Sequence, residues 1–143
     1  MKDLYRKLHK AYYFIYNLFY SIFCLHNIRI FLNNHITVGL KYVKKRKTKF
    51  PHPIGIVIGQ KVVLGDNCII YQNVTIGSKN TANYKNSKYP VLGDNVTIYP
   101  NSIIIGDVKI GNNAIIGAGS LVLDDVEEDS IVAGTPAKKI EKK

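Results

Sequence analysis

The sequence has few cysteines and lacks an apolar run long enough to cross a membrane. Its 143 residues include two cysteines, Cys24 and Cys68, whose spacing fits neither a zinc site nor a disulfide framework. We therefore expect two reduced, buried thiols in a cytoplasmic protein. The apolar stretch at residues 11–25 falls short of the about 20 residues that span a bilayer. Because no small-residue cleavage site follows it, we expect no signal peptide.

Acidic residues are also scarce. There are 10 Asp and Glu against 20 Lys and Arg, a formal net charge of +10. This excess favours an anionic partner, which can be a phosphorylated cofactor, an acidic glycan, a membrane surface or nucleic acid. Cations cluster at Lys41, Lys44, Lys45, Arg46, Lys47 and Lys49. Such a run is typical of a solvated surface or of a guide for an anionic substrate, and no nucleic-acid-reading element surrounds it.

The N-terminal part of the chain has the pattern of a helix. Apolar residues recur at steps of three and four over residues 2–25, and aromatic residues occupy the opposite side. A helix that is apolar all round is buried in an oligomer or lies against lipid. The second interpretation is supported by the cations Lys2, Arg6, Lys7 and Lys10, and it would place the protein at the inner face of the membrane. Both interpretations stay open.

Aliphatic residues then recur at every sixth position, with one interruption. The first column of this repeat is aliphatic throughout: Ile58, Leu64, Ile70, Ile76, Leu92, Ile98, Ile104, Ile110, Ile116 and Val122. The fifth column holds smaller residues: Val62, Cys68, Val74, Val96, Ser102, Val108, Ala114, Ser120 and Val126. The second column is often glycine: Gly59, Gly65, Gly77, Gly93, Gly111 and Gly117. Chance does not explain three columns that agree over so many repeats.

A period of six does not suit an α-helix, but a short strand and a turn per repeat satisfy it. Three repeats make one triangular coil, and successive coils stack about 4.8 Å apart. The first and fifth columns then point into the core, and glycine supplies a permissive backbone at the turns. The sequence therefore predicts an all-β parallel β-helix over residues 51–143, preceded by a helix and basic connector over residues 1–50.

One polar segment breaks the repeat. Residues 78–90 are rich in Asn and Lys and end at Pro90, which indicates an external loop. Loops on a rigid scaffold commonly carry function. After Val126 the repeat fades, and we expect the remaining residues to cap the open end of the coil.

Residues 52–140 resemble the hexapeptide-repeat acyltransferases with a left-handed β-helix. The resemblance is to the serine acetyltransferase-like branch and its relatives that O-acetylate sugars of surface polysaccharides. The matching stretches are HPIGIVIG at 52–59, NVTIG at 73–77, YPVLGDNVTI at 89–98, IGAGSLV at 116–122 and VAGTPAKKI at 132–140. The resemblance implies a homotrimer with active sites between neighbouring subunits and acetyl-CoA bound in a groove, without a metal.

His52 matches the catalytic histidine of serine acetyltransferases. Attack of an alcohol on a thioester needs a base, and histidine suits this task near neutral pH. The other three histidines, His9, His26 and His35, precede the repeats. From the residues alone, a base and a packing histidine at the end of the prism are equally good interpretations. The resemblance favours the base.

The resemblance also implies cofactor contacts. It places Gly77 and Ser78 beside the pantetheine groove, Pro100 and Ala118 on turns that line this groove, and Lys138 near the nucleotide phosphates. Small residues at turns let an extended arm approach the backbone, although ordinary turn and packing roles explain Gly77 and Ala118 equally well. A backbone amide at such a turn is a candidate oxyanion-hole donor.

Two positions depart from serine acetyltransferases. Pro51 stands where those enzymes have an Asp before the catalytic histidine, and Tyr89 stands where they have a second histidine. We therefore favour a sugar hydroxyl over serine as the acceptor, with Tyr89 as a candidate acceptor contact or a solvent-facing loop residue.

Three alternative functions have different consequences. A serine O-acetyltransferase would act on free L-serine. A catalytically silent trimeric scaffold would show no turnover with any acceptor. A zinc-dependent carbonic anhydrase needs three imidazoles around the metal, which one scaffold histidine per chain does not supply.

Overall fold

The computed structural model describes residues 9, 33–80 and 86–140. The chain divides into two compact units, residues 1–32 and 33–143, and the fold described below belongs to the second. Apart from His9, the helix predicted over residues 2–25 lies outside the described residues. Within the described ranges, no helix combines the length and the apolar character needed to span a membrane.

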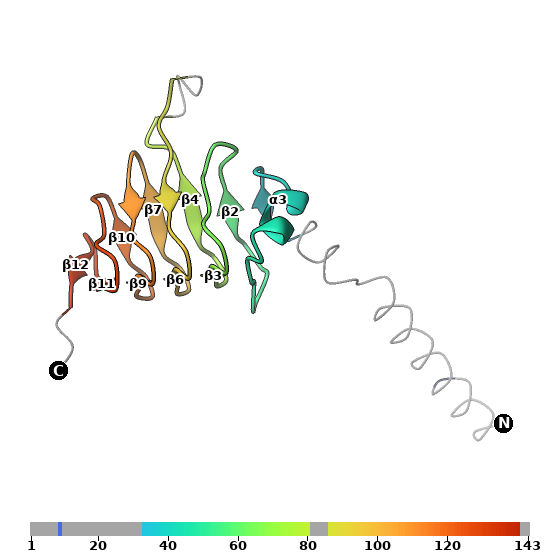
Figure 1. Ribbon diagram of the computed structural model, residues 1–143. Coiled ribbons are helices and arrows are strands. Elements are labelled where there is room, and N and C mark those ends of the chain that lie inside the picture. The colour runs from blue at the N-terminus through green and yellow to red at the C-terminus, as the bar shows by residue number, and fades with distance from the viewer. Residues whose placement is uncertain (1–8, 10–32, 81–85, 141–143) are drawn as a thin grey trace. The chain divides into compact units, whose positions relative to one another are not determined.

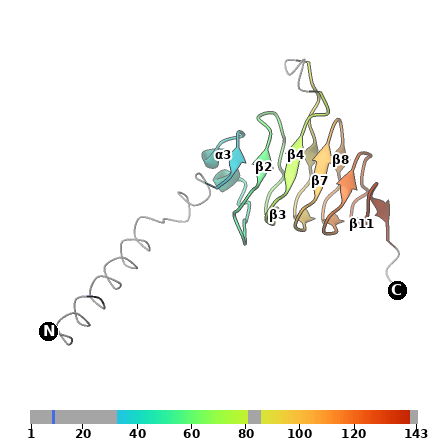
Figure 2. The ribbon, with the colours of Figure 1, turned by 180° about the vertical axis from the view of Figure 1, so that it is seen from behind.

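Three sheets of short strands form a triangular solenoid (Figure 1, Figure 2). The first sheet contains β1 (His35–Ile36), β2 (Val57–Ile58), β4 (Thr75–Gly77), β7 (Ile103–Ile105) and β10 (Leu121–Val122). The second contains β3 (Ile69–Ile70), β6 (Thr97–Ile98), β9 (Ile115–Ile116), β11 (Ile131–Ala133) and β12 (Lys138–Lys139). The third contains β5 (Val91–Leu92) and β8 (Lys109–Ile110), with bridges at Val63 and Val126. All pairs are parallel except β11 with β12, which confirms the predicted parallel β-helix, here of about five turns.

The two inward columns predicted from the repeat form the core. Every first-column side chain is at most 2% exposed, and the fifth-column side chains are also buried. Polar members of the fifth column bond to backbone carbonyls, as buried polar groups require. Ser102 Oγ lies 2.8 Å from the carbonyl oxygens of both Tyr99 and Gly117, which share its single O–H. Burial raises the pKa of the Cys68 thiol to about 11. This thiol is therefore protonated at neutral pH and is a poor nucleophile.

The turns do not use the second-column glycines in the way that the sequence suggests. Positive φ angles occur instead at Asn67, Asn95, Asn113 and Asp129 on one corner and at Gly55, Asn73, Asn101 and Gly119 on another. Asparagine tolerates this conformation, and its amide bonds to the next coil, as in Asn95 Nδ2 to Asn113 Oδ1 at 3.2 Å. The expectation that the second-column glycines supply permissive φ was wrong. Five of these six glycines have a neighbouring side chain or backbone where a Cβ would project.

The solenoid begins before residue 51. Strand β1 pairs with β2, and the short helix α3 (Leu40–Lys45) stands where the third sheet would have its next strand. The Tyr42 hydroxyl accepts from the Leu64 N–H at 3.1 Å and donates to the Leu64 carbonyl at 3.2 Å. Part of the expected basic connector is therefore built into the first coil. In both ribbon views α3 lies at the end of the solenoid opposite β12.

The predicted loop connects β4 to β5. Its described parts leave the body of the solenoid, at the top of Figure 1. Where the loop returns, Pro90 is buried and the Tyr89 ring packs over Gly59, so that a Cβ at Gly59 would lie 2.8 Å from Tyr89 Cε1. The Lys88 ammonium contacts the Asp107 carboxylate at 2.5 Å. The base of the loop is thus held on the coil.

Candidate active site

His52 lies on a turn that is longer than its counterparts. Phe50 is 4% exposed and occupies a core position, and the next first-column residue, Ile58, follows eight residues later instead of six. The two extra residues bulge out at the corner between the second and first sheets, as the narrow excursion beside β2 shows (Figure 1). As a result the His52 side chain is exposed. The corresponding turns of the later coils keep the six-residue spacing and have no such insertion.

Asn34 holds this turn on both sides. Its Oδ1 accepts from the Ile56 N–H at 2.8 Å, and its Nδ2 donates to the Pro53 carbonyl at 2.9 Å. The Gly55 N–H donates to the Asn33 carbonyl at 2.9 Å, and the Ile54 N–H donates to the His52 carbonyl at 2.9 Å. Sequence reasoning missed Asn34, because nothing in its local pattern separates it from other loop asparagines.

We expect Asn34→Ala to lower kcat by about tenfold, since loss of two hydrogen bonds, at about 1 kcal/mol each, loosens the turn that positions His52. Acetyl-transfer kinetics and thermal unfolding of the same preparation measure the effect. The matched control is Asn95→Ala, which removes side-chain hydrogen bonds at a corner remote from His52. Equal losses of activity for the two variants would argue against a positioning role.

Two tyrosines continue from His52 along the solenoid axis. The His52 and Tyr71 rings are 6.2 Å apart between centroids and tilted by 45°. Tyr71 and Tyr99 are stacked at 5.2 Å and 10°, and Tyr99 is 41% exposed. The column ends at Gly117, which has no side chain. Both tyrosines occupy the second column, where glycine is otherwise common, and that break in the pattern was the signal that sequence reasoning passed over.

The structure brings together only some of the predicted site residues. Pro100 and Ala118 lie on the same corner as His52, in successive coils, and the Gly119 N–H donates to the Pro100 carbonyl at 2.9 Å. Gly77, Ser78 and Tyr89 lie at the next corner, where the loop leaves the first sheet. There the Ser78 hydroxyl donates to the Asn80 carbonyl at 3.3 Å, and a Cβ at Gly77 would meet open space. The first sheet separates these two groups within one chain.

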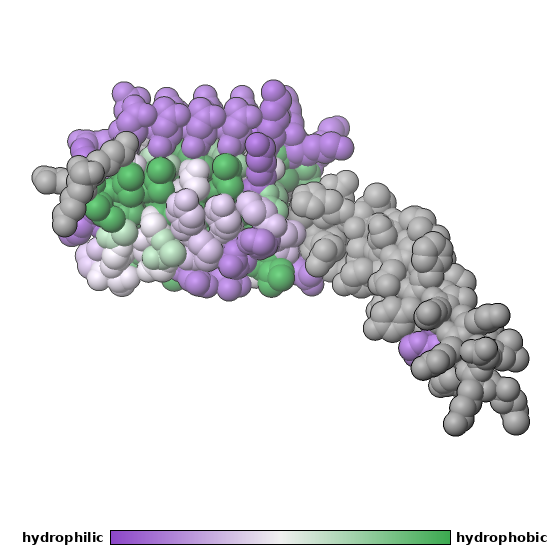
Figure 3. All heavy atoms as spheres, turned by 90° about the horizontal axis from the view of Figure 1, so that it is seen from below, coloured by the Kyte–Doolittle hydropathy of each residue, from purple (hydrophilic) through white to green (hydrophobic). Residues whose placement is uncertain are grey.

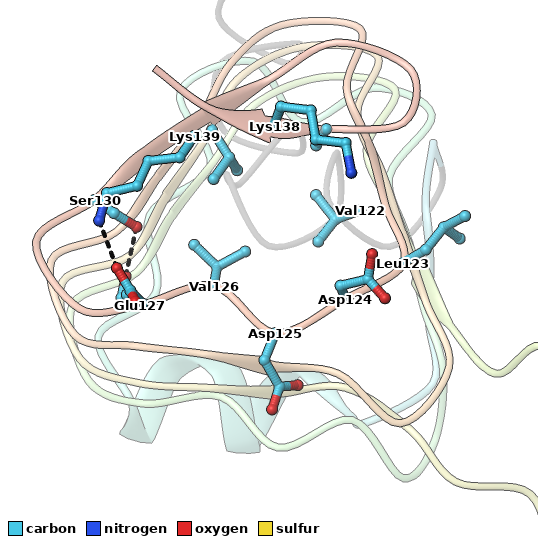
Figure 4. A pocket seen from close by; sticks show the side chains of 11 residues that line it. Val122, Leu123, Asp124, Asp125, Val126, Glu127, Ser130, Lys138 and Lys139 are labelled. Atoms are coloured by element: carbon cyan, nitrogen blue, oxygen red, sulfur yellow. Dashed lines mark hydrogen bonds and ion pairs between the residues drawn. The ribbon is translucent and has the colours of Figure 1, made fainter. Parts of the chain in front are cut away.

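Lys138 lies in β12 at the far end of the solenoid. It borders a pocket of about 350 Å³ that Asp124, Asp125 and Glu127 also line (Figure 4). Lys139 contacts Glu127 at 2.5 Å and lowers the pKa of that carboxyl. Three carboxylates line this pocket against two lysines, one of which is paired with Glu127, so it offers no net positive charge to a phosphate. The assignment of Lys138 to the nucleotide phosphates stays a prediction, as do the other cofactor contacts.

Within residues 33–80 and 86–140, no cluster of three His, Cys, Asp or Glu side chains is arranged to hold a metal ion. In the same part of the chain, the His52 imidazole has a ring contact with Tyr71 but no side-chain hydrogen bond.

Comparison with known proteins agrees with this geometry. The family model described as bacterial transferase hexapeptide (six repeats) matches residues 89–124. A serine acetyltransferase of Synechococcus elongatus is 42% identical over 89 residues, which are 62% of this chain and 36% of that protein. The solved serine acetyltransferase of Neisseria gonorrhoeae has a TM-score of 0.62 at 39% identity, covering 66% of this chain and 36% of its own. A serine acetyltransferase in complex with CoA has a TM-score of 0.59 at 33% identity, covering 65% and 37%.

The shared part is limited in length. The chain spans between about a third and a half of the relatives that it matches. The solved structures overlie about two thirds of this chain. Through this solenoid the chain is similar to the serine acetyltransferases, and residues 89–124 match the hexapeptide-repeat transferase model.

Proposed function

We propose that this protein is an acetyl-CoA-dependent O-acetyltransferase in which His52 is the general base. The observation that carries the proposal is the turn at His52, which has a two-residue insertion and is held by hydrogen bonds from Asn34. This turn presents the imidazole on the corner where Pro100 and Ala118 also lie. The similar proteins are named serine acetyltransferases, and one was solved with CoA, which supports the same chemistry.

The chain's own residues account for the proton transfers. His52 accepts the proton of the acceptor hydroxyl, so that the oxygen attacks the thioester carbonyl. A backbone N–H at the corner stabilises the resulting oxyanion. His52 then returns the proton to the departing thiolate of CoA. An acyl-enzyme on Cys68 is disfavoured, because that thiol is buried and its pKa is raised to about 11.

The backbone around the turns suits an extended cofactor arm. Ala118 is exposed, and a Cβ at either Gly77 or Gly119 would meet open space. A pantetheine arm could therefore approach the main chain at either corner without a clash. The acetyl-CoA contacts proposed for Gly77, Ser78, Pro100 and Ala118 rest on this access.

A homotrimer would complete the site. His52 and the Gly77–Ser78 pair lie on different corners of one solenoid, so a site containing both needs corners from two subunits. Exposed aliphatic side chains on the outside of the coils, including Val57, Val63, Val91 and Ile103, supply apolar surface for such contacts. Figure 3 shows a hydrophobic band beside a hydrophilic edge along the solenoid.

The proposal includes two candidate acetyl acceptors, L-serine and a sugar hydroxyl. L-serine is favoured by the names of the similar proteins. A sugar hydroxyl is favoured by the stacked Tyr71 and Tyr99 beside His52, because aromatic faces suit the apolar face of a pyranose ring. The replacement of the expected carboxylate and second imidazole by Pro51 and Tyr89 points the same way.

Release of CoA with L-serine, compared with a panel of nucleotide sugars and free hexoses, distinguishes the acceptors. For a sugar acceptor, we expect Tyr99→Ala to raise the acceptor KM by about fivefold, from loss of one aromatic contact of about 1 kcal/mol, while the KM for acetyl-CoA stays unchanged. Turnover with serine alone would reject the sugar, and no turnover with any acceptor would reject the enzyme in favour of a silent scaffold. A rise in the acetyl-CoA KM only would place Tyr99 along the cofactor instead.

A further inference from the structure

The first coil carries a basic surface for which the acetyl-transfer proposal has no use. Within residues 33–65 there are seven lysines and arginines and no acidic residue. Five exposed lysines form what we call the basic rim: Lys41, Lys44, Lys45, Lys47 and Lys49. The last coil has the opposite charge, with Asp124, Asp125, Glu127, Glu128 and Asp129 all exposed. Charge is therefore polarised along the solenoid axis.

The rim lysines lie at one end of the solenoid. Lys41, Lys44 and Lys45 share one side of α3, because residues three and four apart are neighbours on a helix. The opposite side is fixed by Val43, which is 4% exposed. Lys47 and Lys49 follow in the same first coil, where Lys49 bridges to Ile69 at the edge of the second sheet. Both ribbon views place α3 at this end (Figure 1, Figure 2).

The arginine in this run has a different role. The Arg46 guanidinium contacts the Asp66 carboxylate at 3.3 Å and lies 5.7 Å from the centre of the Tyr42 ring. It is thus tied to the coil, while the lysines carry the outward charge. Lysine is a hydrated point charge on a flexible stem, which suits a diffuse anionic surface better than a ligand needing bidentate recognition.

We propose that the basic rim binds the anionic phospholipid headgroups of a membrane, with the first coil facing the bilayer. Residues 11–25, which precede it in the sequence, are apolar and aromatic, and stable peripheral binding commonly combines an apolar segment with a polybasic patch. Single-stranded nucleic acid fits less well, since it needs exposed aromatic platforms. The Tyr42 hydroxyl is bonded to Leu64, and its ring contacts Arg46.

Co-sedimentation of the full-length protein with vesicles tests the proposal. Vesicles of phosphatidylcholine with phosphatidylglycerol should bind, phosphatidylcholine alone should bind far less, and high salt should release the protein. We expect the triple variant K41Q/K44Q/K45Q to reduce partitioning by about 100-fold, since each lysine near an anionic surface contributes about a factor of five. The control K79Q/K88Q/K109Q removes the same charge from exposed positions elsewhere and should retain most binding.

Several outcomes would overturn the proposal. These are equal binding to neutral and anionic vesicles, equal losses in the two triple variants, or binding to a single-stranded RNA probe without binding to vesicles. If the α3 variant unfolds, K47Q/K49Q tests the same rim outside the helix, with an expected loss of about 20-fold. Vesicle binding needs no acetyl transfer, so this result and the result for the enzyme are independent.

Discussion

Replacement of His52 by alanine is expected to lower kcat about a thousandfold, because a positioned general base contributes between about 10² and 10⁴ in rate. The variant should fold normally, since the imidazole is exposed and contacts the ring of Tyr71. The KM for acetyl-CoA should change little, because the imidazole acts on the acceptor proton. Steady-state kinetics of CoA release, with circular dichroism as the folding check, measure both.

The matched control for this variant is His35→Ala. His35 is an exposed histidine in β1 of the same coil region, so its replacement removes an imidazole without touching the His52 turn. It should retain nearly full activity. Activity of His52→Ala within threefold of the parent protein would exclude His52 as the base and leave the packing interpretation.

Gly65→Ala should destabilise the solenoid by about 3 kcal/mol and lower Tm by roughly 10 °C, the range of severe overpacking. A Cβ on Gly65 would lie 2.2 Å from the Gly93 carbonyl oxygen, 2.3 Å from the Gly93 carbonyl carbon and 2.6 Å from the Asp94 nitrogen. All three are backbone atoms of the next coil, so no rotamer change relieves the clash. The coils must separate locally, which weakens the ladder at Val63 and Val91.

Gly77→Ala is the control for stability. It changes the same residue type in the same column, but a Cβ there has no neighbour within 4 Å, so Tm should shift by less than about 2 °C. Scanning calorimetry of the two variants provides the comparison. A small effect at Gly65 would mean that the coils are more loosely stacked than the contacts indicate.

The repeat made the architecture predictable because each coil meets the same packing requirement. Ile58, Ile76 and Ile104 point inward because every sixth residue occupies an equivalent, core-facing position in a coil. All three are fully buried. The loop at 78–90 was predictable for the converse reason, since its polar residues have no place in the core. The extra first coil was not predictable, because Tyr42 and Val43 lack the six-residue pattern and act through contacts with Leu64 and the core.

The candidate site was only partly predictable. The residue type and the family resemblance singled out His52, but its exposure depends on Phe50 entering the core and on Asn34 bonding both arms of the turn. Tyr71 and Tyr99 are far apart in sequence, and their stacking follows from the spacing between coils.

By itself, the sequence determined the period, the inward columns and the position of the interruption, because each follows from which side chains must leave water. The tertiary structure decided which corner each site residue occupies. It also decided that His52 and Gly77 lie on different corners of one chain and that five asparagines, rather than the second-column glycines, adopt positive φ at the turns. These features depend on stacking between coils, which joins residues fifteen or more positions apart and leaves no local trace in the sequence.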